Sequence, residues 1–167
     1  MTSASQSSQT PALTAPILLL MSAAPGLAVA SNYYAQPLLH TISEQFSLSS
    51  ATAGSIVTTA QLSYAVGLML LVPLGDMFER RSLIVLMNLL SSGGLLISAF
   101  APNIGVLILG TALTGMLSVV AQILVPFAAT LAAPHERGKA VGTVMSGLLL
   151  GILLARTVAG ALADLGS

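Results

Sequence analysis

The chain has 167 residues, of which 55% are hydrophobic and only 6% are charged, and its formal net charge is zero. A soluble domain carries about 25% charged residues, because its surface must interact with water. This composition excludes an ordinary soluble domain and predicts an all-α integral membrane protein.

Residues 1–16 are Ser, Thr, Gln, Ala and Pro with almost nothing else and no charge, so we expect a disordered amino-terminal tail. We expect residues 17–167 to form a transmembrane helical domain. A bilayer core about 30 Å thick needs about 20 apolar residues per helix. The apolar stretches predict five helices, at 17–36, 51–74, 83–100, 104–131 and 140–163.

Individual residues predict how these helices begin, end and bend. Pro37 is expected to end the first helix, because proline cannot donate the hydrogen bond of a helix interior. Ser49 and Ser50 are expected to cap the second helix. Pro126 is expected to kink the fourth.

Lysine and arginine outside the helices are confined to alternate loops. Arg80 and Arg81 follow the second helix, and Arg137 and Lys139 follow the fourth, whereas the loops after the first and third helices contain neither. Basic loops of membrane proteins lie on the cytoplasmic side. We therefore expect a cytoplasmic amino terminus and, after five spans, a carboxyl end of this chain on the outer side.

Short sequence echoes indicate a weak internal repeat. Gly54 opens the second helix and Asp76 closes it, while Gly142 and Asp164 flank the fifth helix at the same spacing. Repeated helices three spans apart cross the membrane in opposite directions, which is typical of transporters. On this pattern the first triplet of helices is complete and the second lacks its last member.

Asp76, Arg80 and Arg81 lie in a tight turn between the second and third helices. A carboxylate and guanidinium groups so close at a membrane edge can pair and hold helix ends together. Equally, the arginine pair can be only a topological anchor. The residues alone leave both interpretations open.

This turn resembles the signature G-x-x-x-D-R-x-G-R-R of the major facilitator superfamily of secondary transporters. Three positions match the signature, namely Asp76, Arg80 and Arg81. Three positions depart from it, namely Val72, Met77 and Glu79. Residues 31–39, Ser-Asn-Tyr-Tyr-Ala-Gln-Pro-Leu-Leu, are also similar to the first helix of a bacterial subgroup of drug and small-solute exporters.

The resemblance covers nearly the whole chain after the tail. It implies five transmembrane helices of a major-facilitator-type six-helix half, which is therefore incomplete, in the inner (plasma) membrane of a bacterium. It also implies that Asp76, Arg80 and Arg81 form a gating loop on the cytoplasmic side.

Polar side chains within the spans are candidates for a substrate path. In lipid, such amides must face inward, where they either hydrogen-bond neighbouring helices or line a polar path. The superfamily lines its path with helices like the first, fourth and fifth. The resemblance therefore favours five residues, Asn32, Tyr33, Gln36, Gln122 and Arg156.

Arg156 is the single basic residue inside a span. A charge in the bilayer costs at least about 2.5 kcal/mol, so this side chain should face a cavity or a partner. It can instead extend to the outer surface of the membrane.

Gly147 and Gly151 in the fifth helix have two possible roles. Small residues four apart let another helix approach closely. Together with Gly138 they also match the start of the superfamily's antiporter signature, G-x8-G-x3-G-P, in which Ile152 replaces the proline.

The functional hypothesis from the sequence is a secondary active transporter of small solutes. We expect it to be an exporter. Here it would be a truncated, inactive amino-terminal part whose partners are the lipid bilayer, a small-molecule substrate, and the missing carboxyl-terminal half or another chain. The alternative is a small five-span subunit or assembly protein that acts through helix–helix interaction. The chain has no cysteine and no catalytic constellation, so we expect no enzyme, metal, cofactor or nucleic-acid partner.

Overall fold

The structure is a computed structural model that describes residues 14–165. Within that range the chain forms seven helices: α1 (Ala15–Tyr33), α2 (Ala35–Gln45), α3 (Ser50–Met77), α4 (Arg80–Ala99), α5 (Ile104–Leu117), α6 (Val120–Leu131) and α7 (Arg137–Leu165). Because α1 continues into α2 and α5 into α6, these helices make five segments long and apolar enough to span a membrane. The prediction of an all-α protein with five transmembrane helices is confirmed.

Most of the predicted tail, residues 1–13, lies outside the described residues. The last residues assigned to it, 15 and 16, are helical instead, because α1 begins at Ala15. Pro16 stands in the first turn, where a missing N–H leaves no hydrogen bond unmade.

The prediction that the first helix ends at Pro37 is wrong, since the helical segment continues to Gln45. Pro37 disrupts the helix four residues earlier. Its ring clashes with the carbonyl of Tyr33, and proline has no backbone N–H to donate to that carbonyl. The interruption is confined to Tyr34, whose backbone still has right-handed helical angles. The chain therefore resumes as α2 at Ala35.

The fourth segment is interrupted at Ser118 and Val119, not at Pro126, which lies inside α6. The Ser118 hydroxyl donates to the carbonyl of Gly115 at 2.8 Å, and the N–H of Gln122 donates to the carbonyl of Val119 at 2.9 Å. Bonds of this short range compete with the regular helical pattern. They separate α5 from α6 at a buried position.

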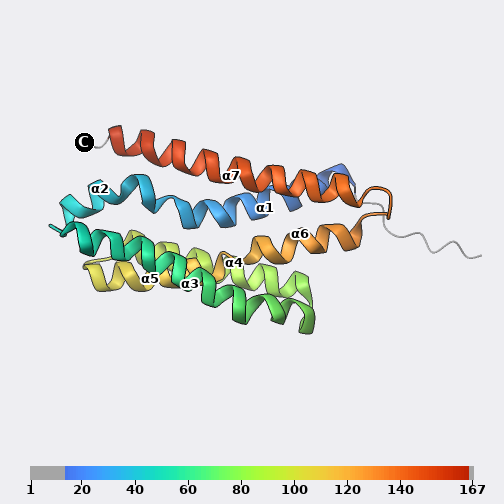
Figure 1. Ribbon diagram of the computed structural model, residues 1–167, viewed down its shortest axis with the longest axis horizontal. Coiled ribbons are helices and arrows are strands. Elements are labelled where there is room, and N and C mark those ends of the chain that lie inside the picture. The colour runs from blue at the N-terminus through green and yellow to red at the C-terminus, as the bar shows by residue number, and fades with distance from the viewer. Residues whose placement is uncertain (1–13, 166–167) are drawn as a thin grey trace, which may run out of the picture.

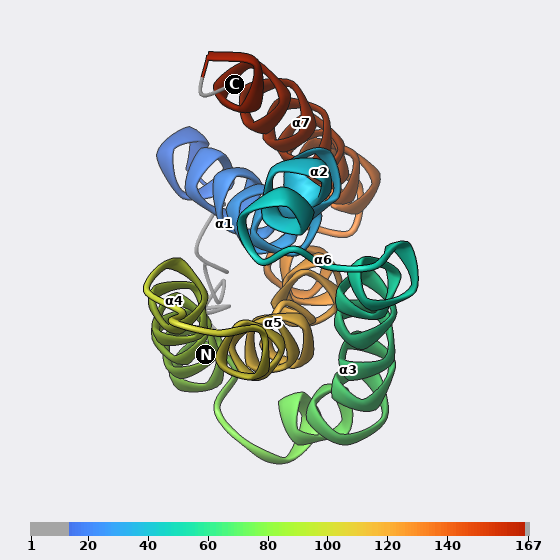
Figure 2. The ribbon, with the colours of Figure 1, turned by 90° about the vertical axis from the view of Figure 1, so that its left-hand side faces the viewer.

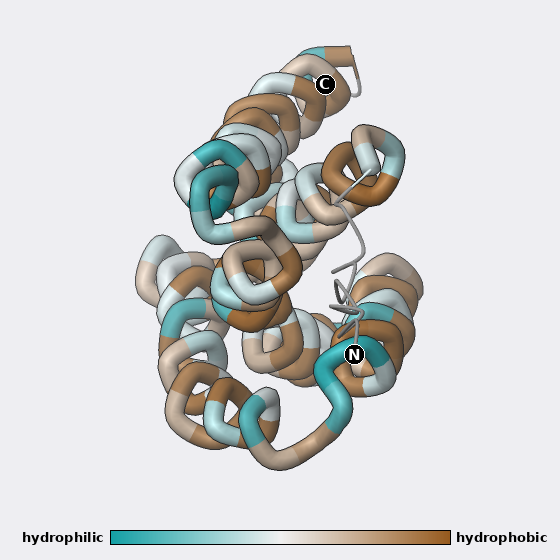
Figure 3. Tube along the Cα trace, turned by 90° about the vertical axis from the view of Figure 1, so that its right-hand side faces the viewer, coloured by the Kyte–Doolittle hydropathy of each residue, from teal (hydrophilic) through white to brown (hydrophobic). Residues whose placement is uncertain are grey.

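The five segments run alternately in opposite directions (Figure 1). The α3–α4 turn and the α6–α7 connection, which carry the two charged clusters, lie at the same end of the bundle as the start of α1. Figure 3 looks onto this end and shows strongly hydrophilic colour in these connections against largely apolar helices. This arrangement agrees with the alternation of basic loops on which the predicted orientation rests.

The core is centred on the α5/α6 segment (Figure 2). Half of its most apolar stretch is buried, compared with 6% for α7. Val119, Val120 and Val144 are completely buried in the core. Helix α7 therefore lies at one edge of the bundle and exposes most of its surface.

Candidate functional site

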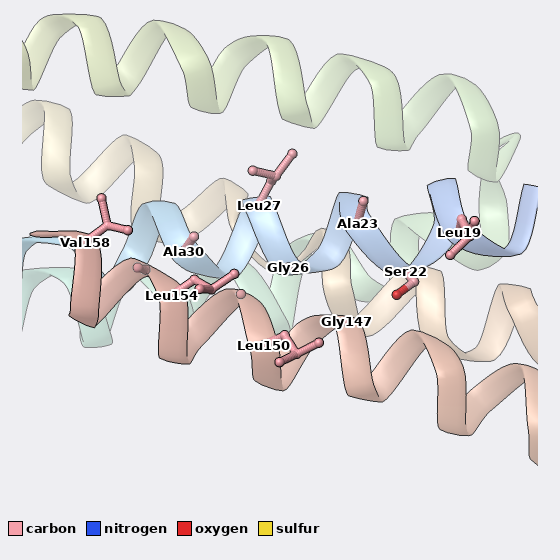
Figure 4. A pocket seen from close by; sticks show the side chains of 12 residues that line it. Leu19, Ser22, Ala23, Gly26, Leu27, Ala30, Gly147, Leu150, Leu154 and Val158 are labelled. Carbon is pink, nitrogen blue, oxygen red and sulfur yellow. The ribbon is translucent and has the colours of Figure 1, made fainter. Parts of the chain in front are cut away.

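Helices α1 and α7 make the most extensive contact in the bundle, and they approach through small residues. Ser22 and Gly26 on α1 face Gly147 and Gly151 on α7 (Figure 4). A Cβ atom added to Gly26 would lie 2.6 Å from the carbonyl oxygen of Gly147, closer than any ordinary contact. Gly147 and Gly151 therefore lie where the two backbones touch, as small residues do in membrane helix pairs.

A groove of about 560 Å³ follows this contact. Its lining is almost entirely apolar and comes from both helices, including Leu19, Leu150 and Leu154. None of the five residues predicted to form a substrate path lines it. The groove is therefore distinct from the polar residues described below.

One hydrogen bond joins polar side chains of two different helices within the span. The side-chain amide of Gln122 on α6 donates to the hydroxyl of Tyr64 on α3 at 3.2 Å. Tyr64 lies at the middle of the 28-residue helix α3. Gln61, one turn earlier on the same helix face, and Gln122 are both exposed. Three polar side chains thus gather within the span, on a surface that the described residues leave open.

Tyr64 is not among the path residues predicted from the sequence. The available signal was its spacing of three residues from Gln61, which places both side chains on one face of a helix. Its pairing with Gln122, 58 residues away, depends on the packing of α3 against α5 and α6 and has no local sequence signal.

The other predicted path residues occupy α1, α2 and α7. Asn32, Tyr33 and Gln36 are half-buried around the α1–α2 junction, and Arg156 is exposed on α7. Arg156 lies nine residues before the end of α7 at Leu165, which is about 13 Å along a helix. Among residues 14–165, no hydrogen bond or ion pair joins these four side chains to Gln122.

The charged turn is organised by Arg80, the first residue of α4. Its Nη2 donates to Asp76 Oδ1 at 3.1 Å, and its Nε donates to the carbonyl oxygen of Gly75 at 3.2 Å. The Asp76 side chain is 76% exposed, so this ion pair contributes about 0–1 kcal/mol to stability. Arg81 is exposed and makes no ion pair within the described part of the chain.

Comparison with known proteins assigns a family. The sequence profile of the Major Facilitator Superfamily matches residues 21–167. The chain is 70% identical over 154 residues to "Uncharacterized transporter YgaY" of Escherichia coli O157:H7, which covers 92% of this chain and 39% of that protein. It is 32% identical over 145 residues to "Probable transporter SCO4007" of Streptomyces coelicolor, covering 87% of this chain and 33% of that protein.

A further similarity is 33% identity over 115 residues to a protein named "D-xylose transporter" of Levilactobacillus brevis, covering 68% of this chain and 25% of that protein. No solved structure matches the chain. The chain thus spans well under half the length of these relatives and corresponds to the amino-terminal portion of a transporter of this family.

Proposed function

This chain belongs to the Major Facilitator Superfamily, and on that premise we propose that it forms the amino-terminal portion of a secondary active exporter of small solutes. The observation that carries the proposal is the Gln122–Tyr64 hydrogen bond, which lies within the span and is open to one side. Polar groups facing lipid are costly, so an open polar pair at this depth favours a solute path. Asn32, Tyr33, Gln36 and Arg156 extend that path in the proposal.

The chemistry of these groups defines the class of solute. Amide, phenol and guanidinium groups form hydrogen bonds with hydroxyl, carbonyl and anionic groups. All five acidic residues of the chain lie at helix ends or in connections. This portion therefore has no carboxylate in the middle of a span that could bind a cation. We propose a neutral or anionic polar solute. A sugar is a concrete candidate, because one relative is named as a D-xylose transporter.

The open faces of α3 and α7 support a second set of helices as a partner. Gln61, Gln122 and Arg156 are exposed, and an added Cβ at Gly54 on α3 or Gly142 on α7 would meet nothing within 4 Å. We propose that further helices, from a continuation of the chain or from another chain, cover these faces and complete the path. The 167-residue chain alone is then inactive in transport.

We also propose that the protein lies in the bacterial inner membrane with the α3–α4 turn in the cytoplasm. Within this orientation Asp76, Arg80 and Arg81 form the cytoplasmic gating loop. Its support is the position of both basic connections at one end of the bundle (Figure 1).

A chimera tests the proposed function. This chain replaces the matching 154 residues of the Escherichia coli relative, and the product is reconstituted in proteoliposomes preloaded with labelled D-xylose or another small polar solute from a panel. We expect saturable efflux from the chimera, its loss in Gln122→Leu and its retention in Gln45→Leu, where an exposed amide at the end of α2 changes instead.

Two results would contradict the proposal. Saturable efflux from the 167-residue chain alone would show that no further helices are needed. Equal efflux from the Gln122→Leu and Gln45→Leu chimeras would remove Gln122 from the path. The absence of efflux for the whole panel would instead favour the alternative of a membrane subunit that acts through helix contacts.

A further inference from the structure

The Arg80 side chain, on α4, contacts two other helices, although its charge partner lies on only one of them. Two of its contacts, with Asp76 and the carbonyl of Gly75, go to the end of α3. The third is with Phe127 on α6, whose ring centroid lies 6.0 Å from the Arg80 guanidinium carbon. Cations over aromatic faces are attracted at about this distance. Phe127 therefore provides the contact between Arg80 and α6.

The contact with Phe127 differs in kind from the ion pair. Asp76 is 76% exposed, so water and salt screen its attraction for Arg80. Arg80 itself is only 29% exposed, and Phe127 is half-buried against the core. A cation–π contact strengthens as its partners lose water. The Phe127 ring therefore contacts the guanidinium group of Arg80 on the side that faces the core, away from water.

Phe127 belongs to the same short helix as Gln122. Helix α6 has 12 residues and is separated from α5 by the interruption at Ser118 and Val119. Its Gln122 bonds to Tyr64 on α3, and its Phe127, five residues further along, contacts Arg80. Both contacts are made by the same helix, so a displacement of α6 as a whole changes both of them.

We propose that Phe127 is a positioning residue that couples the polar pair to the charged turn, so that the turn separates from α6 only when α6 itself moves. The role of the turn as a gate rests on the proposed function above. The coupling itself is a property of the Arg80–Phe127 contact and can be measured without a solute.

The absence of native cysteine allows a direct test. Cysteines replace Met77 at the turn and Thr130 on α6, both exposed, and carry spin labels in the full 167-residue chain in lipid nanodiscs. Pulsed electron spin resonance then gives the distribution of distances between them. We expect Phe127→Leu to raise the ratio of separated to closed populations about two- to five-fold, as loss of a modest cation–π contact does.

Three further variants isolate the ring–cation contact. Phe127→Trp should keep the parental distribution, because tryptophan is the strongest π partner for a cation. Phe100→Leu is the matched control, since this ring is 82% exposed, caps the end of α4 opposite to Arg80 and should have no effect. In an Arg80→Gln background, Phe127→Leu should cause no additional change, which a purely structural packing role would not produce.

The outcomes decide between coupling and packing. An unchanged distribution in Phe127→Leu, or equal effects with and without Arg80, would overturn the proposal. If Phe127→Leu loses its helical circular dichroism, Arg80→Gln alone serves as the test and must produce the same second population. Unchanged distances together with efflux from the chimera would reject the coupling and leave the proposed function standing. The expected change in distances without efflux from the chimera would support the coupling and count against the proposed function.

Discussion

Replacing Gly151 with alanine should destabilise the bundle, because the added methyl group has no space. The Cβ atom would lie 2.6 Å from the carbonyl carbon of Gly26 and still closer to its Cα and oxygen. Carbon atoms at optimal separation are about 3.5–4.0 Å apart, so α1 and α7 would have to separate by about 1 Å. Both sides of the contact are backbone, which cannot turn away as a side chain does. Overpacking of this kind costs about 1–3 kcal/mol.

A matched control lies on the same helix. An added Cβ at Gly160 would meet nothing within 4 Å. Gly160→Ala should therefore be neutral or stabilise the protein by up to about 1 kcal/mol, the difference in helix propensity between glycine and alanine. The contrast between the two variants separates a packing effect from a propensity effect.

The free energy of unfolding can be measured by reversible unfolding in mixed micelles, followed by circular dichroism. Adding Gly26→Ala to Gly151→Ala should cost less than the sum of the single changes, because one separation of the helices relieves both clashes. If Gly151→Ala is as stable as Gly160→Ala, the close approach of α1 and α7 is not present in the folded protein.

Three further outcomes follow from contacts elsewhere. Gly94→Ala should lower the free energy of unfolding by about 1–3 kcal/mol, because its Cβ would lie 2.6 Å from Thr114 Oγ1. Gly93→Ala, whose Cβ would meet nothing within 4 Å, should not, and equal unfolding curves for the two variants would contradict the α4–α5 packing. Asp76→Asn should change the unfolding free energy by no more than about 1 kcal/mol, and less at high salt, which denaturation at two ionic strengths measures. A cysteine at Met77 should react with a membrane-impermeant maleimide only from the cytoplasmic side, and labelling in intact cells would reverse the proposed orientation.

Much of the fold could be predicted from local patterns in the chain. The fourth span coincides with its predicted bounds, and Ser49 caps α3 by accepting the N–H of Thr52 at 3.2 Å, as its position predicts. Such features depend only on nearby residues. Pro37 shows the limit of this reasoning, because a proline can interrupt a transmembrane segment without ending it when helix formation on either side is favourable.

The candidate site could be predicted only in part. Gln122 was identified because an amide in an apolar span must find a partner or a path, which is a property of its own sequence neighbourhood. Its actual partner, Tyr64, and the contact of Phe127 with Arg80 join different helices. Which faces meet depends on the rotation of each helix about its axis, and the apolar composition of these helices on all sides leaves that rotation unspecified.

The amino-acid sequence by itself determined that this protein lies in a lipid bilayer, how many spans it has and that its basic loops alternate. These follow from the cost of placing charges and unpaired backbone groups in lipid, which each segment meets independently of the others. The tertiary structure decided which small residues touch, as Gly26 does with Gly147 and Gly151, and which polar groups remain open. In lipid, association of helices depends on close packing rather than on burial of apolar surface, so only the assembled bundle reveals these contacts.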